Sequence, residues 1–335
     1  MPSDVALVIT SISSPNAALI DYARQAAVHG CRFILIGDSK SPADFVLDGC
    51  DFWSLLRQQT MPFSLAKLVP ERHYARKNLG YLQAIFEGAT IIIETDDDNF
   101  ARPEFWEERK AAQSVAVLEN ADWVNIYGYF TDSRIWPRGF PLEQLHAELP
   151  PAGPVLDDVN CPIQQGLADE NPDVDAVYRL TYPLPQNFRV NLSLALGPGS
   201  WCPFNSQNTT WFREAFPLLY LPAYCSFRMT DIWRSFVAQR ICWENGWHVQ
   251  FHRPTVWQER NQHNLLKDFT DEIPGYLNNA AICAALQKLK LKPGKKLLGD
   301  NLLRCYQVMI DMGLVGEQEQ NLLRAWIADI SPLLT

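Results

Sequence analysis

A run of β-branched residues that ends in consecutive carboxylates constrains the fold more than any other feature of this chain. Residues Ile91–Ile93 are followed by Glu94 and Thr95, and then by the three aspartates Asp96–Asp98. Such an apolar run predicts a buried strand, whose end delivers the charges to one edge of a sheet. Three adjacent carboxylates repel one another and, in a site of low dielectric, need a cation to be ionised together. The alternative is a solvated acidic turn that follows the strand.

The segments before this strand alternate between strand and helix patterns. Apolar runs at Val5–Thr10 and Arg32–Asp38 predict buried strands, and the residues between them predict a helix that Gly30 ends. A second helix is expected over Tyr74–Gly88. This order predicts an α/β fold with right-handed crossovers, in which ligands bind beyond the carboxyl ends of the strands. The polar residues expected at that edge are Thr10, Ser11, Asp38 and the three aspartates.

Length, charge and cysteine content narrow the class of protein. With 335 residues, of which 47% are apolar, the chain can form one large α/β domain or two smaller ones. A net charge of -9 argues against a nucleic-acid binder. The 8 cysteines include no Cys-x-x-Cys pair, which favours reduced thiols in a cytosolic protein. We see neither a signal peptide nor an apolar stretch of the roughly 20 residues that span a membrane, and therefore expect a soluble, cytoplasmic protein.

The composition of the chain changes twice after about residue 120. Residues 120–230 are rich in Pro, Gly, Asn and aromatics, with a short strand expected at Trp123–Tyr127, and Asp231–Glu244 is typical of a helix. Leucine-spaced helices follow, so we divide the chain into a main domain over 1–275 and a C-terminal helical extension over 276–335. A basic run in this extension is either a solvated surface or a contact with anionic lipid or polysaccharide. It contains Lys288, Lys290, Lys292, Lys295 and Lys296.

A basic segment lies one helix before the triple-aspartate strand. It runs from Arg72 to Asn78 and includes Arg76. Its side chains could lie over the same crevice as the aspartates, where positioned cations would stabilise a diphosphate leaving group. An ordinary basic helix start is the alternative. We assign Arg76 and Asn78 to the binding of a nucleotide sugar.

Several collinear motifs within 70–260 together carry a family resemblance. They include Arg76–Ile85, Glu94–Asp98, Trp136–Glu143, Gln164–Gly166, Pro172–Val177, Pro203–Thr209 and Glu244–Gly246. In this pattern the chain resembles the STELLO-like glycosyltransferase family of plants and, more distantly, the reversibly glycosylated polypeptides, which are UDP-arabinopyranose mutases. The resemblance implies the GT-A fold of nucleotide-diphospho-sugar transferases, a Rossmann-like mixed sheet flanked by helices.

The resemblance also implies a metal-dependent site for the nucleotide sugar. In GT-A enzymes the acidic motif binds a divalent cation that bridges the two phosphates, and oxygen ligands suit Mn²⁺ or Mg²⁺. We assign Asp96 and Asp98 to the metal and Asp97 to the ribose. The STELLO-like pattern has a basic residue at the position of Asp98, whereas the mutase-like pattern keeps all three aspartates. This departure leaves open which pair binds the metal.

Further roles follow from positions that match the GT-A pattern. Asp231 lies at an expected helix start, where inverting GT-A enzymes keep their general base, although it could instead cap the helix. Trp136 could stack on a sugar and Arg138 could bind phosphate, unless the Trp only anchors a loop. Asn205 and Asn208 are assigned to the sugar or the acceptor.

Three histidines lie near the end of the expected catalytic domain, where many GT-A enzymes supply a metal ligand. They are His248, His252 and His263. The STELLO-like histidine aligns with Trp257 instead, so whether any of the three contacts a metal stays open.

The predicted function is transfer of a sugar from a nucleotide-diphospho-sugar, above all a UDP-sugar, to a glycan, a lipid-linked acceptor or another hydroxyl group. A nucleotide-sugar mutase would use the same acids. A non-catalytic partner of a polysaccharide-synthesis complex is an alternative from a different class. A nucleotidyltransferase is disfavoured because no Gly-rich phosphate loop follows Val5–Thr10.

Overall fold

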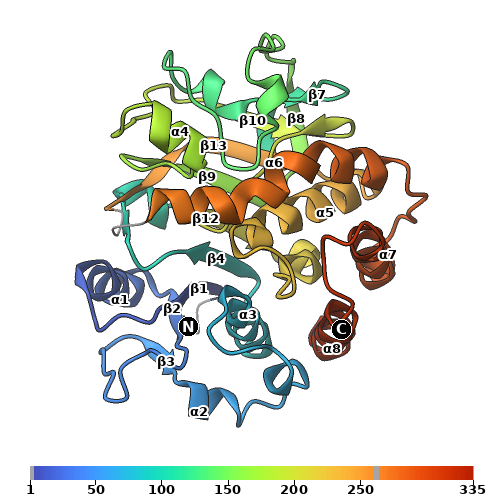
Figure 1. The fold of residues 1–335 in the computed structure, drawn as a ribbon. Coiled ribbons are helices and arrows are strands. Elements are labelled where there is room, and N and C mark those ends of the chain that lie inside the picture. Colours follow the sequence, from blue (N-terminus) through green and yellow to red (C-terminus); the bar gives the residue numbers. More distant parts are fainter. Residues whose placement is uncertain (1–3, 260–263, 335) are drawn as a thin grey trace.

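One large mixed β-sheet organises the molecule (Figure 1). The computed structural model describes residues 4–259 and 264–334. Within these residues the sheet has 11 strands in the order β3-β2-β1-β4-β12-β9-β13-β10-β6-β8, with β5 paired to β13. The strands are β1 (Val5–Thr10), β2 (Arg32–Ile36), β3 (Asp51–Trp53), β4 (Ile91–Thr95), β5 (Asn99–Ala101), β6 (Ala112–Leu118), β8 (Val155–Asn160), β9 (Ile163–Asp169), β10 (Ser193–Leu196), β12 (Asn208–Phe212) and β13 (Val249–Gln258).

Helices pack on both faces of this sheet, and further helices extend the C-terminal part. The α-helices are α1 (Ala17–His29), α2 (Leu55–Gln58), α3 (Lys77–Phe86), α4 (Ala176–Thr181), α5 (Thr230–Glu244), α6 (Leu265–Gln287), α7 (Leu298–Asp311) and α8 (Glu319–Ile330). Two short 3-10 helices also matter for the site, η2 (Tyr74–Arg76) and η7 (Phe227–Met229). This architecture confirms the predicted GT-A-like α/β fold with C-terminal helices.

Strand β1 shows why its sequence is apolar throughout. Leu7 and Ile9 face the core cluster that contains α1, while Ala6 and Val8 face the cluster that contains α3. A strand covered on both faces carries a continuous apolar run, because successive side chains point to opposite sides. The cover by α3 is close: a Cβ at Gly80 would lie 2.6 Å from Val8 Cγ1.

The direction of the strands brings several polar segments to one edge. Strands β1, β2 and β4 run parallel, so their carboxyl ends coincide. Strand β12 runs antiparallel to β4, with Asn208 opposite Thr95. The residues before β12 therefore lie beside those after β4, at the edge where ligands bind in open α/β sheets.

A buried ion pair fixes α5 to this edge. Both oxygens of Glu94 accept hydrogen bonds from Arg234, at 3.0 and 2.7 Å, and both side chains are almost fully buried. Tyr81 and Trp211 donate to the same carboxylate. Because every acceptor position of Glu94 is used, this motif residue acts in the core, and it holds the start of α5 near the end of β4.

The C-terminal helices pack onto the main body through buried polar contacts. Glu319, at the start of α8, accepts hydrogen bonds from the backbone N–H groups of Ala223 and Tyr224 at 3.0 and 2.7 Å. The expected boundary between 275 and 276 falls inside α6, which packs against α4, η7 and α5. The division into two domains stays a prediction. Among the described helices, none combines the length and apolar character needed to cross a bilayer.

The middle of the chain departs most from expectation. The predicted strand Trp123–Tyr127 is mostly wrong: only Asp122–Trp123 is extended, as β7, and Ile126–Tyr129 forms a 3-10 turn. Strand β7 pairs with the two-residue β11 (Ser200–Trp201) in a separate small sheet. Short aromatic segments of this kind fit a buried loop as well as a strand, so their sequence pattern alone does not distinguish the two.

Candidate functional site

A cavity of about 510 Å³ lies at the carboxyl ends of β1, β2 and β4. Segments from both halves of the chain form its walls, because β12 and α5 approach the same edge. Its polar lining comprises Thr10, Ser11, Asp38, Lys40, Arg72, His73, Tyr74, Arg76, Asp96, Asp97, Asp98, Arg138, Asp173, Arg179, Gln207, Arg228, Asp231 and Gln258. Six carboxylates accompany six Lys and Arg side chains, besides His73, so the chemistry of the cavity depends on which of these groups already have partners.

The three aspartates after β4 point to different partners. Asp96 accepts from the Tyr74 hydroxyl at 2.9 Å and lies 3.6 Å from the Lys77 ammonium group. Asp97 accepts from Ser11. Asp98 accepts from the Gln258 amide at 3.0 Å. Burial raises the pKa of Asp96 to about 7, against the opposing attraction of Lys77.

The carboxylates fit a divalent cation only with help from a ligand. The described residues contain no group of three or more His, Cys, Asp or Glu side chains placed to hold a metal ion. A Mg²⁺-type site commonly takes one or two carboxylates and completes its shell with phosphate oxygens and water. Asp96 and Asp98, both partly exposed on the cavity wall, meet that smaller requirement.

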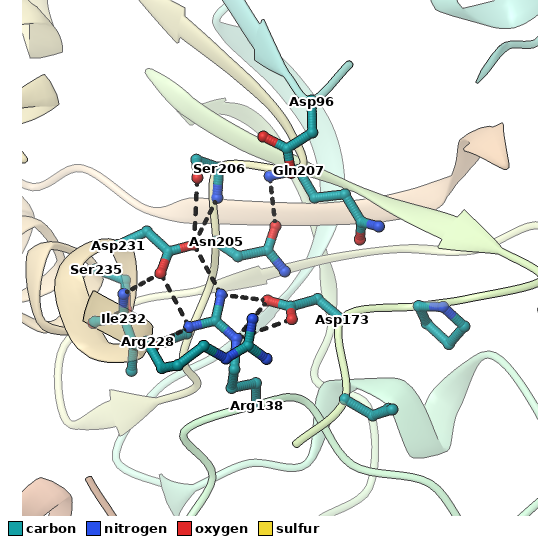
Figure 2. A network of polar contacts seen from close by, with 12 residues as sticks. Asp96, Arg138, Asp173, Asn205, Ser206, Gln207, Arg228, Asp231, Ile232 and Ser235 are labelled. Atoms are coloured by element: carbon teal, nitrogen blue, oxygen red, sulfur yellow. Dashed lines mark hydrogen bonds and ion pairs between the residues drawn. The ribbon is translucent and has the colours of Figure 1, made fainter. Parts of the chain in front are cut away.

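Arg138 occupies the centre of a network at the opposite wall (Figure 2). It binds Asp231 through Nη1 at 3.0 Å and Nη2 at 2.9 Å, and Asp173 through Nε and Nη2, both at 2.8 Å. A further N–H donates to the Arg228 carbonyl. All five N–H groups of the guanidinium are thus engaged, and Arg138 is buried between two carboxylates.

Both carboxylate oxygens of Asp231 likewise accept hydrogen bonds within the protein. Besides Arg138, it accepts from the backbone N–H and the hydroxyl of Ser206, each at 3.2 Å. Burial would raise the pKa of Asp231, but the charge and hydrogen bonds of Arg138 outweigh it and lower the pKa to about 2. A general base works best with a pKa near the working pH, so this environment disfavours the base role assigned from the helix-start position.

Known proteins that are similar to this chain in sequence are glycosyltransferases of one kind. A family model described as STELLO glycosyltransferases matches residues 228–334. "Probable glycosyltransferase STELLO2" of Arabidopsis thaliana is 31% identical over 326 residues, which cover 90% of this chain and 42% of that protein. "Probable glycosyltransferase STELLO1" of the same plant is 29% identical, covering 90% of this chain and 41% of its own length.

This chain is a relative of the STELLO glycosyltransferases. The resemblance read from the motifs is therefore confirmed, and the chain spans less than half the length of these two STELLO proteins. The matched STELLO region begins at Arg228 and contains Asp231 and the core residue Arg234, but it does not reach the triple aspartate. Only the pairwise matches, which span most of the chain, extend over both walls of the cavity.

Four residues assigned to ligand binding do not line the cavity of this STELLO relative. Their polar groups instead satisfy the backbone or the core. Asn78 pairs with both backbone groups of Leu221, at 2.8 and 2.9 Å, and Asn208 donates to Leu167 at 3.0 Å. Trp136 donates to the buried Asp175 at 2.8 Å, which supports the alternative of a loop anchor. Asn205 accepts from the Gln207 backbone at 3.0 Å.

Arg76 lines the cavity, but its guanidinium group is hydrogen-bonded to other residues of the protein. Its Nε donates to Gln58 Oε1 at 2.9 Å and its Nη1 to the Val69 carbonyl at 3.0 Å, and the side chain is buried. Thr10, Ser11, Asp38 and the three aspartates do reach the cavity as expected. The predicted strand-end residues thus line the cavity together, whereas the predicted amides do not line it.

Two cavity residues, the exposed cation Lys40 and the exposed aromatic Phe227, were not predicted from the sequence. Arg72, an exposed cation on the same wall, was expected over the crevice only as part of the basic segment and was given no role of its own. Arg72 adopts φ 55°, a left-handed conformation that is uncommon for a residue with a side chain. Arg72 opens the basic segment noticed in the sequence, but no pattern there distinguishes its backbone from that of its neighbours.

Of the three histidines considered as metal ligands, the two that the structure describes, His248 and His252, lie outside the cavity lining. His248 pairs with Glu119 at 3.1 Å, and His252 contacts the Arg253 carbonyl at 2.9 Å. Burial lowers the pKa of His252 to about 4. Position 263 lies outside the described residues. Trp257, which aligns with the STELLO-like histidine, stacks on Phe100 with ring centroids 4.4 Å apart.

Proposed function

We propose that this chain is a glycosyltransferase domain that binds a nucleotide-diphospho-sugar in the cavity and transfers its sugar to a hydroxyl acceptor on a glycan or lipid-linked molecule. The donor we favour is a UDP-sugar. One observation supports this most: the cavity joins the strand-end residues Thr10, Ser11 and Asp38 to the aspartates after β4. Open α/β sheets bind nucleotides at such an edge.

We assign the phosphate contacts to Arg72 and Lys40, in place of the two arginines expected from the sequence. Arg76 and Arg138 already satisfy their guanidinium groups within the protein. Arg72 and Lys40 are exposed on the cavity wall, and Arg72 donates a long hydrogen bond of 3.3 Å to the exposed Ser39 hydroxyl. Non-glycine residues in the left-handed region cluster at functional sites, which supports Arg72 as the main phosphate ligand.

The cation we propose is Mn²⁺ or Mg²⁺, held by Asp96 and Asp98. When bound, it would neutralise charge on the diphosphate as that group leaves. Tyr74 and Lys77 hold the Asp96 carboxylate from the protein side, and Gln258 holds Asp98. These contacts orient both carboxylates before a ligand arrives.

A second candidate is favoured by one observation. Because Asp231 is paired with Arg138 and has a pKa of about 2, it is poorly suited to take a proton from an acceptor hydroxyl. A retaining transferase or a nucleotide-sugar mutase needs no base at this place. The nucleotide site would be the same in both cases, so donor binding tests the site independently of the reaction.

Donor binding can be tested by calorimetry of the purified chain with UDP and with UDP-glucose, UDP-galactose and UDP-xylose, each with and without Mn²⁺. We expect binding that depends on Mn²⁺ and raises the melting temperature, since a ligand of the native state stabilises it. The paired variant Asp96→Asn with Asp98→Asn should remove the metal dependence. Nucleotide binding that is absent in the parent, or unchanged in this variant, would contradict the proposal.

A further inference from the structure

Phe227 is an exposed aromatic ring placed on the wall of the cavity. Its side chain is 53% exposed, which is unusual for a large apolar group that lines a polar site. The ring packs in T-shaped geometry against two rings at the start of η2, His73 at 5.7 Å and Tyr74 at 6.5 Å between centroids. The three rings therefore bridge the walls that the N-terminal and C-terminal halves supply.

The segment that carries Phe227 is held on both sides. Ser226 donates a hydrogen bond to the Asp271 carbonyl, and Arg228 binds Glu272 through Nε at 3.0 Å and Nη2 at 2.8 Å. Both partners belong to α6. Because its neighbours are anchored in this way, the backbone of Phe227 is held at the cavity wall by contacts within the protein.

The surroundings of Phe227 place it next to the reacting part of a donor. On one side, Tyr74 donates to Asp96, the proposed metal ligand. On the other side, the carbonyl of the adjacent Arg228 accepts from Arg138, which binds Asp231. The ring thus lies between the acidic cluster and the Arg138 network. A group attached directly to the diphosphate would occupy this space, whereas the nucleoside would lie nearer Ser11.

We propose that Phe227 stacks on the sugar ring of the bound nucleotide sugar and helps to select and orient it. This inference rests on the proposed donor site. An aromatic face can cover the apolar C–H face of a pyranose, and burying an exposed ring is favourable in itself. The hydroxyl groups at the sugar's rim would remain free to reach the polar residues nearby.

Calorimetry with UDP and with the tightest-binding of UDP-glucose, UDP-galactose and UDP-xylose, all in Mn²⁺, tests this subsite. Phe227→Ala should weaken binding of the UDP-sugar about tenfold and leave UDP affinity unchanged, because only the sugar contacts the ring. Phe227→Tyr should retain most of the UDP-sugar affinity. Phe86→Ala is the matched control, since Phe86 is 56% exposed on α3 and does not line the cavity.

The outcomes separate this inference from the donor site. If Phe227→Ala weakens UDP and the UDP-sugar equally, or neither, the ring does not stack on the sugar and the inference fails while the nucleotide site stands. If the parent binds no UDP, the proposed function itself fails. Thermal denaturation of each variant, with a melting temperature near that of the parent, confirms that affinity is compared between folded proteins.

Discussion

Arg138 binds Asp231 side by side, with Nη1–Oδ1 at 3.0 Å and Nη2–Oδ2 at 2.9 Å. The pair joins the loop that carries Arg138 to the first turn of α5. A second carboxylate, that of Asp173, accepts hydrogen bonds from Nε and Nη2 of the same guanidinium. A charge buried in this way depends on its partners, because removing one leaves the other without compensation. Asp231 therefore stabilises the shape of the cavity wall.

The first prediction concerns the role of Asp231. Asp231→Asn should lower the free energy of unfolding by about 1.5–3 kcal/mol, because the amide carries no negative charge and places an NH2 donor where a carboxylate oxygen accepted a hydrogen bond from Arg138. Chemical denaturation followed by circular dichroism measures this directly. A variant of parental stability that transfers sugar at least about 100-fold more slowly would restore Asp231 as the general base.

The second prediction is a pH dependence of the same pair. The pKa of Asp231 falls from an ordinary 3.8 to about 2 in the folded chain, so the folded state takes up its proton later than the unfolded state. The stabilisation is complete above about pH 4 and is lost as the pH falls toward 2. The difference in unfolding free energy between the parent and Asp231→Asn should therefore shrink over this range. A difference that stays constant down to pH 2.5 would show that ionisation of Asp231 does not matter.

Local signals allowed the N-terminal half of the site to be predicted. The runs at Val5–Thr10 and Ile91–Thr95 are apolar because both faces of each strand are covered, and Gly30 ends α1 in the left-handed conformation. Once the strands are parallel, their following residues must meet at one edge. Thr10, Ser11, Asp38 and the aspartates reach the cavity for this reason alone.

The rest of the site depends on contacts between distant segments. The Arg138–Asp231 pair joins residues 93 positions apart, and the Glu94–Arg234 pair joins residues 140 apart. Nothing in either local sequence says which carboxylate will meet which guanidinium, and a basic residue looks the same whether it pairs with protein or ligand. Amides such as Asn208 are ambiguous for the same reason, because the sequence looks alike whether the amide side chain makes hydrogen bonds in the core or to a ligand.

The third prediction concerns the metal. Asp98→Ala should remove the Mn²⁺ dependence of UDP binding and leave the melting temperature of the apo protein within a few degrees of the parent, since Asp98 is partly exposed at the sheet edge. Glu108→Ala is the control, because that carboxylate is 81% exposed and outside the cavity lining. Titration of Mn²⁺ into protein with saturating UDP provides the measurement. Equal Mn²⁺ affinity in the parent and in Asp98→Ala would remove Asp98 from the metal site.

The fourth prediction concerns the basic segment between α6 and α7. Its five lysines, from Lys288 to Lys296, are all exposed on a protein of net charge -9. We expect binding to vesicles that contain phosphatidylserine, because each lysine near an anionic surface contributes about 1 kcal/mol. Replacing all five by Gln should abolish co-sedimentation, with neutral phosphatidylcholine vesicles as the control. Equal sedimentation of parent and variant would identify the segment as a solvated surface.

The last prediction separates two arginines of one segment. Arg72 is exposed on the cavity wall, whereas Arg76 is buried and bound to Gln58 and Val69. Arg72→Ala should weaken binding of UDP, but not of uridine, by about 1.5–3 kcal/mol, the worth of a charge-assisted contact with phosphate. Arg76→Ala should instead lower the free energy of unfolding, because Gln58 and Val69 lose their buried donor. Calorimetry with UDP and uridine, together with chemical denaturation of both variants, measures the two effects. If Arg76→Ala proves the more damaging to UDP affinity while its stability stays parental, the guanidinium of Arg76 turns toward the ligand and the two assignments must be exchanged.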